Sequence, residues 1–118
     1  MHITTVGIDV AKHVFQLHGV DARGRAVLSR RVKCSQLVDA VASLPPCVIG
    51  MEACGSAQHW GRACAPLGHT VKLMHPKYVK PYLKTNKHDR RDAEAICEAV
   101  SRPTMQCVSI ATVKQADL

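Results

Sequence analysis

Aromatic and acidic residues are both scarce in this sequence. Phe, Trp and Tyr make up 3% of its 118 residues. Single-stranded nucleic acid is commonly bound by aromatic side chains on which bases stack, so the composition disfavours that mode of binding. Asp and Glu number 9 against 16 Lys and Arg, which gives a formal net charge of +7. The charge therefore favours a negatively charged partner inside the cell.

Long apolar runs and a secretion signal are also missing. No apolar run reaches the ~18 residues that a membrane-spanning helix needs. The first five residues, MHITT, lack the basic start and apolar run of a signal peptide. We therefore expect a cytoplasmic protein. The length, with a hydrophobic fraction of 47%, predicts one domain with a packed core.

The six cysteines include no Cys-x-x-Cys pair. A reducing compartment disfavours disulfides, so we interpret the cysteines mainly as small buried apolar residues. Zinc binding by Cys54, His59 and Cys64 is a weaker alternative, because their spacing matches no common zinc module.

Hydrophobic periodicity predicts strands over 3–10, 14–20, 26–32, 47–51 and 69–74. Helices are predicted from an N-cap at Ser35 to the prolines at 45 and 46, and over 57–67, 76–83 and 89–101. The apolar, β-branched composition of residues 105–113 predicts an extended segment, with no predicted place in the sheet. Three strands joined by short turns, followed by strands separated by helices, indicate a meander beside a parallel crossover. The predicted fold is α/β, with the mixed five-stranded sheet of ribonuclease H-like proteins flanked by helices.

The excess positive charge is concentrated in one segment. Residues 72–91 contain seven bases and one acid, a net charge of +6, and the other segments together have a net charge of +1. We interpret this stretch as a phosphate-binding surface, with a solvated surface helix or loop as the alternative. Lys12, which closely follows Asp9, is a further candidate phosphate contact or simply an exposed lysine. The seven bases are Lys72, Lys77, Lys80, Lys84, Lys87, Arg90 and Arg91.

Two of the few acids lie at the ends of predicted strands. Asp9 lies inside or at the end of the first strand, and Glu52 lies at the end of the fourth. If these strands are parallel neighbours, both side chains lie at one place, where ligands gather in open α/β sheets. A structural hydrogen bond for Asp9 and a favourable helix dipole for Glu52 are the alternatives.

The predicted helix over 89–101 carries two more acids toward the core. At 100° per residue, Asp89 and Asp92 share a face with Ala93 and Ile96, whereas Glu94 and Glu98 are predicted to face solvent. Helix capping accounts for Asp89 alone. Four inward acids would repel one another without a cation, and oxygen-only ligands favour Mg²⁺ or Mn²⁺.

Three runs resemble the motifs of the DEDD insertion-sequence transposases, a family that includes the Piv-type DNA invertases. They are Val6 to Lys12 (VGIDVAK), Gly50 to Gly55 (GMEACG) and Lys87 to Ile96 (KHDRRDAEAI). The resemblance extends in order over nearly the whole chain. It implies a fold similar to that of the Holliday-junction resolvase RuvC, and a catalytic metal-binding tetrad at Asp9, Glu52, Asp89 and Asp92.

The same resemblance implies Mg²⁺-dependent cutting and joining of DNA during transposition or site-specific recombination. It further implies a dimer or higher assembly, with a structured RNA as a second partner in some members. Family members carry a C-terminal domain with a nucleophilic serine, which Ser35, Ser56 and Ser101 do not match. We expect residues 1–113 to form the metal-binding domain and residues 114–118 to begin the connector. A chain ending there is expected not to complete recombination alone.

Two other functions remain as alternatives. An actin-like ATPase also begins with a strand and Gly-x-Asp, but its phosphate loop needs Gly and Thr or Ser where this chain has Ala11, Lys12 and His13. A non-catalytic nucleic-acid-binding module would explain the basic stretch but not the inward acids.

Overall fold

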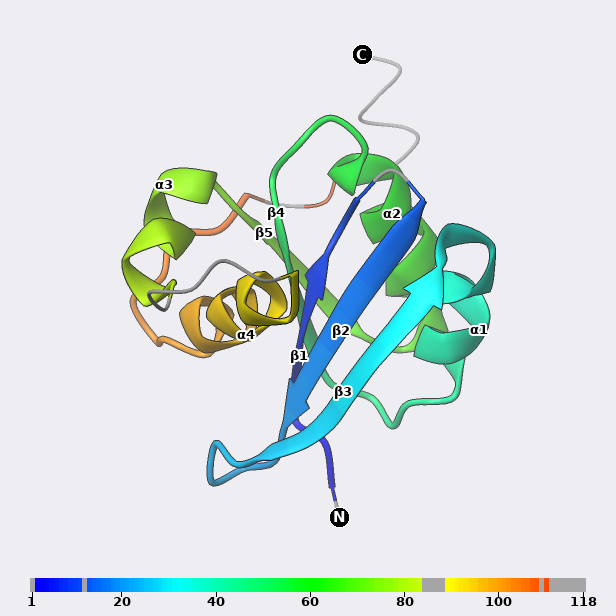
Figure 1. Cartoon of the computed structure of the whole chain (residues 1–118), viewed down its shortest axis with the longest axis horizontal. Helices are drawn as coiled ribbons and strands as arrows, with labels where there is room; N and C mark the ends of the chain where they lie inside the picture. The colour runs from blue at the N-terminus through cyan, green and yellow to red at the C-terminus, as the bar shows by residue number, and fades with distance from the viewer. Residues whose placement is uncertain (1, 12, 84–88, 109, 111–118) are drawn as a thin grey trace.

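A mixed five-stranded sheet with the order β3-β2-β1-β4-β5 forms the centre of the molecule (Figure 1). The computed structural model describes residues 2–11, 13–83, 89–108 and 110, and only the backbone of residues 89–91. β1 pairs antiparallel with β2 and parallel with β4; β2–β3 is antiparallel and β4–β5 parallel. This is the predicted meander and crossover. The strands are β1 (Thr5–Asp9), β2 (Val14–Val20), β3 (Ala26–Lys33), β4 (Val48–Glu52) and β5 (Thr70–Met74).

Helices cover both faces of the sheet (Figure 1). On one face lie α1 (Leu37–Ala42) and α2 (Ala57–Cys64), and the other face is covered by α4 (Asp89–Val100), with α3 (Pro76–Val79) beside it. Side chains alternate along each strand, so each strand contributes to both layers. Short 3-10 turns follow or precede the helices at Cys34–Gln36, Ala65–Leu67 and Lys80–Tyr82. Within the described ranges, no helix has the length and hydrophobicity of a membrane span.

Two glycines in neighbouring strands let α4 approach the sheet closely. Gly7 of β1 is paired with Gly50 of β4. A Cβ at Gly7 would collide with the Ala93 carbonyl oxygen and the Cys97 backbone nitrogen. A Cβ at Gly50 would come within 2.6 Å of the Val100 Cβ. The backbone of α4 is therefore seated directly over β1 and β4, which fixes the height of the helix and its acids.

The structure differs from the sequence prediction at two local points. Ser35 does not cap α1, because it lies inside the 3-10 turn; instead the Gln36 side-chain oxygen accepts from the Lys33 backbone N–H at 3.2 Å. The prediction gave no place to the segment after α4. Val108 forms an isolated antiparallel bridge with Leu73, so this segment follows the outer edge of β5.

Candidate metal and nucleic-acid site

Asp9 and Glu52 lie side by side at the carboxyl ends of two parallel strands. Ile8 of β1 is opposite Met51 of β4, and each acid is the next residue of its strand. Asp9 and Gly7 are two residues apart, as are Glu52 and Gly50, so both acids point to the α4 face. Both side chains are partly exposed. The predicted meeting of the two strand ends is thus present in the fold.

Asp92 of α4 joins Glu52 in a pocket of about 300 Å³. The pKa of Glu52 is raised, first because burial disfavours its charge and then because the Asp92 carboxylate repels it. Lys80 lines the same pocket, so one base from the predicted phosphate-binding stretch lies beside two of the predicted acids. Pro76, Val79 and Leu83 complete the wall. The sequence alone gave no indication of these apolar wall residues.

Asp89 begins α4 three residues before Asp92, and its side chain lies outside the described residues. Among the side chains that the structure does describe, no group of three or more His, Cys, Asp or Glu is arranged to hold a metal ion. The zinc alternative gains no support, since Cys64 is buried whereas Cys54 and His59 are exposed. All six cysteines are free.

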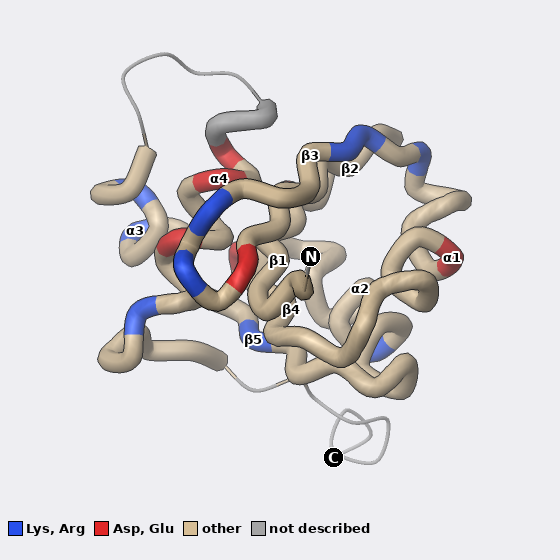
Figure 2. The backbone as a smooth tube through the Cα atoms, turned by 90° about the horizontal axis from the view of Figure 1, so that it is seen from below, with Lys and Arg blue, Asp and Glu red and all other residues tan. Residues whose placement is uncertain are grey.

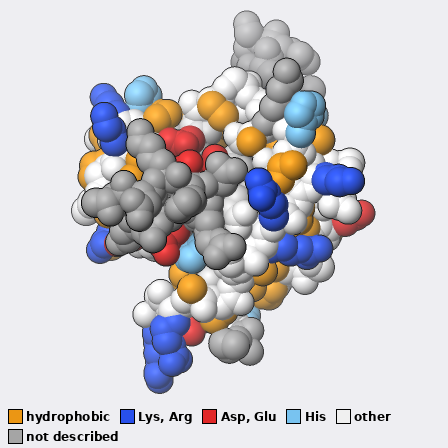
Figure 3. All heavy atoms as spheres, in the orientation of Figure 1, with side chains coloured by type: hydrophobic (Ala, Val, Ile, Leu, Met, Phe, Trp, Pro, Cys, Tyr) orange, Lys and Arg blue, Asp and Glu red, His pale blue; other side chains and the backbone are white. Residues whose placement is uncertain are grey.

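The basic residues of the predicted phosphate-binding stretch flank this pocket on the α3 and β5 side. Lys72, Lys77 and Lys80 are exposed. Basic positions on α3 and on β3 lie on opposite sides of the acidic positions of α4 (Figure 2). Acidic side chains gather above α4 in the region where β4 ends (Figure 3). Lys12, Lys84 and Lys87, with the side chains of Arg90 and Arg91, lie outside the described residues.

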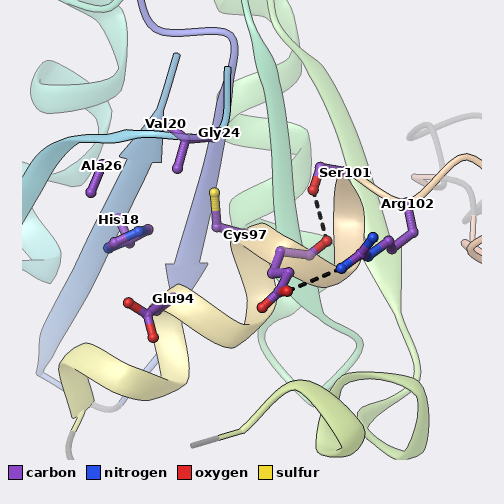
Figure 4. Close-up of a pocket in the computed structure, with 9 residues that line it drawn as sticks. His18, Val20, Gly24, Ala26, Glu94, Cys97, Ser101 and Arg102 are labelled. Carbon is purple, nitrogen blue, oxygen red and sulfur yellow. Dashed lines mark hydrogen bonds and ion pairs between the residues drawn. The ribbon is translucent and has the colours of Figure 1, made fainter. Parts of the chain in front are cut away.

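A second pocket, of about 410 Å³, lies between α4 and the β2–β3 hairpin (Figure 4). Glu94 and Glu98, which were predicted to face solvent, line this pocket and are partly exposed. His18 faces Glu94 there; burial lowers the pKa of the imidazole, and the Glu94 charge partly opposes that shift. Its Nδ1 is buried without a hydrogen-bond partner among the described residues. The sequence signal for this pocket was His18, a polar residue in the middle of an alternating strand.

Known proteins similar to this chain are transposases. A family model described as a transposase, the IS110-type DEDD transposase model, matches residues 6–118. The chain belongs to the DEDD transposase family. The chain is 51% identical over 115 residues to the "Probable family 20 transposase" of Pseudomonas aeruginosa, covering 98% of this chain and 34% of that protein. It is 49% identical to the "Transposase for insertion sequence element IS1111A" of Coxiella burnetii, covering 98% of this chain and 32% of that one.

This DEDD transposase chain thus spans about a third of the length of the curated relatives that it matches. Among solved structures it resembles Thermus thermophilus RuvC in complex with a Holliday junction substrate. The TM-score is 0.65 at 15% identity, covering 92% of this chain and 100% of that chain. At this identity the likeness shows the fold. The ribonuclease H-like fold predicted from the sequence is confirmed, and neither alternative function gains support.

Proposed function

We propose that this chain is the N-terminal, metal-binding domain of a DNA transposase or site-specific recombinase that cuts and joins DNA strands with Mg²⁺ or Mn²⁺. One observation carries the proposal: Glu52, at a strand end, and Asp92, on a helix, line one pocket together with Lys80. Acids for a cation beside a base for phosphate are the combination that phosphodiester chemistry needs.

The residues fit a divalent cation. Mg²⁺ and Mn²⁺ prefer oxygen ligands, and the proposed ligands are the carboxylates of Asp9, Glu52, Asp89 and Asp92. The raised pKa of Glu52 supports this assignment, because it reflects the burial of its own charge and repulsion from the Asp92 carboxylate. A bound cation would offset both unfavourable contributions. When bound, the ion supplies Lewis-acid stabilisation of the charge that develops at the reacting phosphate.

The chain's own residues bind and orient the DNA. Lys80, beside Glu52 and Asp92, is suited to bind a phosphate next to the reacting one. We propose that further bases extend that contact along the DNA backbone: Lys12, Lys72, Lys77, Lys84, Lys87, Arg90 and Arg91.

We further propose that the protein forms a homo-oligomer on paired DNA ends, that a structured RNA is a second partner, and that its location is cytoplasmic and nucleoid-associated. Residues 114–118 are proposed to begin the connector to a serine-bearing domain.

Titration with Mg²⁺ or Mn²⁺ tests the metal site through thermal stability. A cation that binds only the folded state raises Tm, and we expect a rise of a few degrees at saturating metal for the wild type. Asp92→Asn is expected to raise Tm without metal, because it relieves the repulsion on Glu52, and to abolish the metal-linked rise.

Asp39→Asn is the matched control, since Asp39 is an exposed acid on α1 and should leave the metal-linked rise unchanged. No metal-linked rise in the wild type, or an equal rise in Asp92→Asn, would contradict the proposal. Metal-dependent nicking of supercoiled DNA that is lost in Asp92→Asn would extend the support from binding to cleavage.

A further inference from the structure

The adjacent residues Arg30 and Arg31 on the edge strand β3 lie on opposite faces of the sheet. Arg30 is paired with Leu17, which is 1% exposed in the core, and Arg30 lines a surface pocket with Asp39 of α1. Arg31 is paired with Gln16. Because paired residues of an antiparallel ladder point to the same face, Arg30 belongs to the α1 face and Arg31 to the α4 face.

Arg31 lies in one row with the proposed metal site. The register places Arg31 opposite Gln16, and Gln16 opposite Asp9. Neighbouring strands are about 4.8 Å apart, so the Arg31 backbone lies roughly 10 Å from that of Asp9 across the sheet. Lys33, two residues further along β3 and opposite Val14, points to the same face. Both basic side chains are exposed.

The α4 helix leaves this part of the face open. It packs mainly on β1, β2 and β4. Basic side chains lie over β2 and β3 to the right of α4, on the same face as the acidic group (Figure 3). Of the bases in β3, Arg31 and Lys33 lie on this face, at the end of the strand that is nearer to the proposed site. The site therefore has a second basic flank, on the side opposite Lys72, Lys77 and Lys80.

We propose that Arg31 and Lys33 bind the phosphate backbone of duplex DNA on this second flank, so that the duplex runs past the carboxyl ends of β1 and β4, from the β5 side to the β3 side. The inference rests on the proposed function, because it names a further contact of the same site. Five strands span about 19 Å, the rise of roughly five to six base pairs. DNA of that length reaches both flanks while its central phosphates lie over the acids.

Protection of a sheet edge is the competing explanation for these charges. Charged side chains on an edge strand discourage pairing with another chain. That role needs Arg30 as much as Arg31, since both lie on the same edge. Phosphate binding needs only the residues on the α4 face. The two explanations therefore differ in the effect of two neighbouring, identical substitutions.

The experiment measures binding of a fluorescent duplex DNA by anisotropy at several salt concentrations. Arg31→Ala and Lys33→Ala are each expected to weaken binding about 3- to 10-fold. Each should also reduce the slope of log K against log salt by about 1. Arg30→Ala removes the same charge from the other face and should stay within about twofold of wild type. Arg31→Lys retains the charge and should bind nearly as wild type. Circular dichroism and Tm confirm that each variant is folded.

The outcomes separate this inference from the proposed function. A folded wild type that does not bind duplex DNA at low salt would contradict the proposed function itself. Two results would overturn the inference alone, provided that the wild type binds DNA. One is an equal loss of affinity in Arg30→Ala and Arg31→Ala, and the other is no loss of affinity in Arg31→Ala and Lys33→Ala. Losses confined to a structured RNA hairpin tested in parallel would also overturn it, since the flank would then bind RNA.

Discussion

At the scale of single residues, the charge state of Glu52 determines what the site does without a cation. Burial and the Asp92 carboxylate both raise the pKa of Glu52. The folded protein therefore holds this proton more tightly than the unfolded chain does. Stability falls as the pH rises from the ordinary glutamate value of 4.5 through the raised pKa, and the penalty is complete above it.

Glu52→Gln should remove this penalty. In metal-free buffer at neutral pH the variant is expected to be more stable than wild type by about 1 kcal/mol, a few degrees in Tm. The difference between the two proteins should shrink toward zero as the pH falls below 4.5. Denaturant unfolding at a series of pH values measures it. With Asp92→Asn as background the gain should be smaller, because one of its two causes is gone. A pH-independent difference would show that the charge of Glu52 is not responsible.

The places of Asp9, Glu52 and Asp92 in the fold could be predicted from the sequence because each occupies a position with a definite direction. Asp9 and Glu52 end apolar strands, and Asp92 continues an inward helical stripe. The partial burial of Glu94 and Glu98 could not be predicted, since a helical wheel assigns each residue only to the core side or to the solvent side of the helix. The close approach over Gly7 brings even Cys97 into the core at 1% exposure, so the flanks of the helix are partly covered as well.

At the scale of elements, the position of α4 over the sheet depends on Gly7. Gly7→Ala would push its new methyl group into backbone atoms of Ala93 and Cys97, which cannot move aside as a flexible side chain would. We expect a loss of about 2–3 kcal/mol, or roughly 10 °C in Tm. Gly55→Ala is the control, because no atom lies within 4 Å of its added Cβ. Equal Tm values for the two variants would mean that α4 can shift without cost.

The elements themselves were largely predictable, and the exceptions have local causes. Alternation predicts β2 over Val14–Val20, because apolar residues recur on one face of the strand. Both faces of this strand are nevertheless buried, since helices cover the sheet on both sides. Ser35 carries the right chemistry for an N-cap, but the 3-10 turn at Cys34–Gln36 moves the start of α1 to Leu37. The segment around Val108 forms a single bridge to β5, and a single bridge leaves no periodic pattern in a sequence.

At the scale of the whole molecule, the distribution of charge in space differs from its distribution along the chain. Summation along the sequence assigned nearly all the excess to residues 72–91. Residues 21–33 have a net charge of +4, however, and the chain outside these two segments has a net charge of −3. In a sum over the sequence, acids from distant segments cancel the positive charge of residues 21–33. Folding gathers several of those acids at one place, with basic residues on β3 to one side and on α3 to the other (Figure 2).

The cysteines report whether both layers of the molecule unfold together. Cys64 packs on the α2 face and Cys97 on the α4 face, at 0% and 1% exposure. Burial raises the pKa of Cys64 to about 11 and that of Cys97 to about 12, so both remain unreactive thiols in the native state. The exposed Cys54 and Cys107 should react with a thiol reagent at once.

In mild denaturant, Cys64 and Cys97 should be labelled at equal rates that follow the global unfolding equilibrium, because a single small domain opens cooperatively. Mass spectrometry of quenched samples resolves the two sites, and full denaturation, in which all six thiols react, sets the scale. Gly7→Ala should accelerate both sites by the same factor if it destabilises the whole fold. Faster labelling of Cys97 alone would show that α4 opens separately from the sheet, and the acids that it carries would then be positioned by a mobile element.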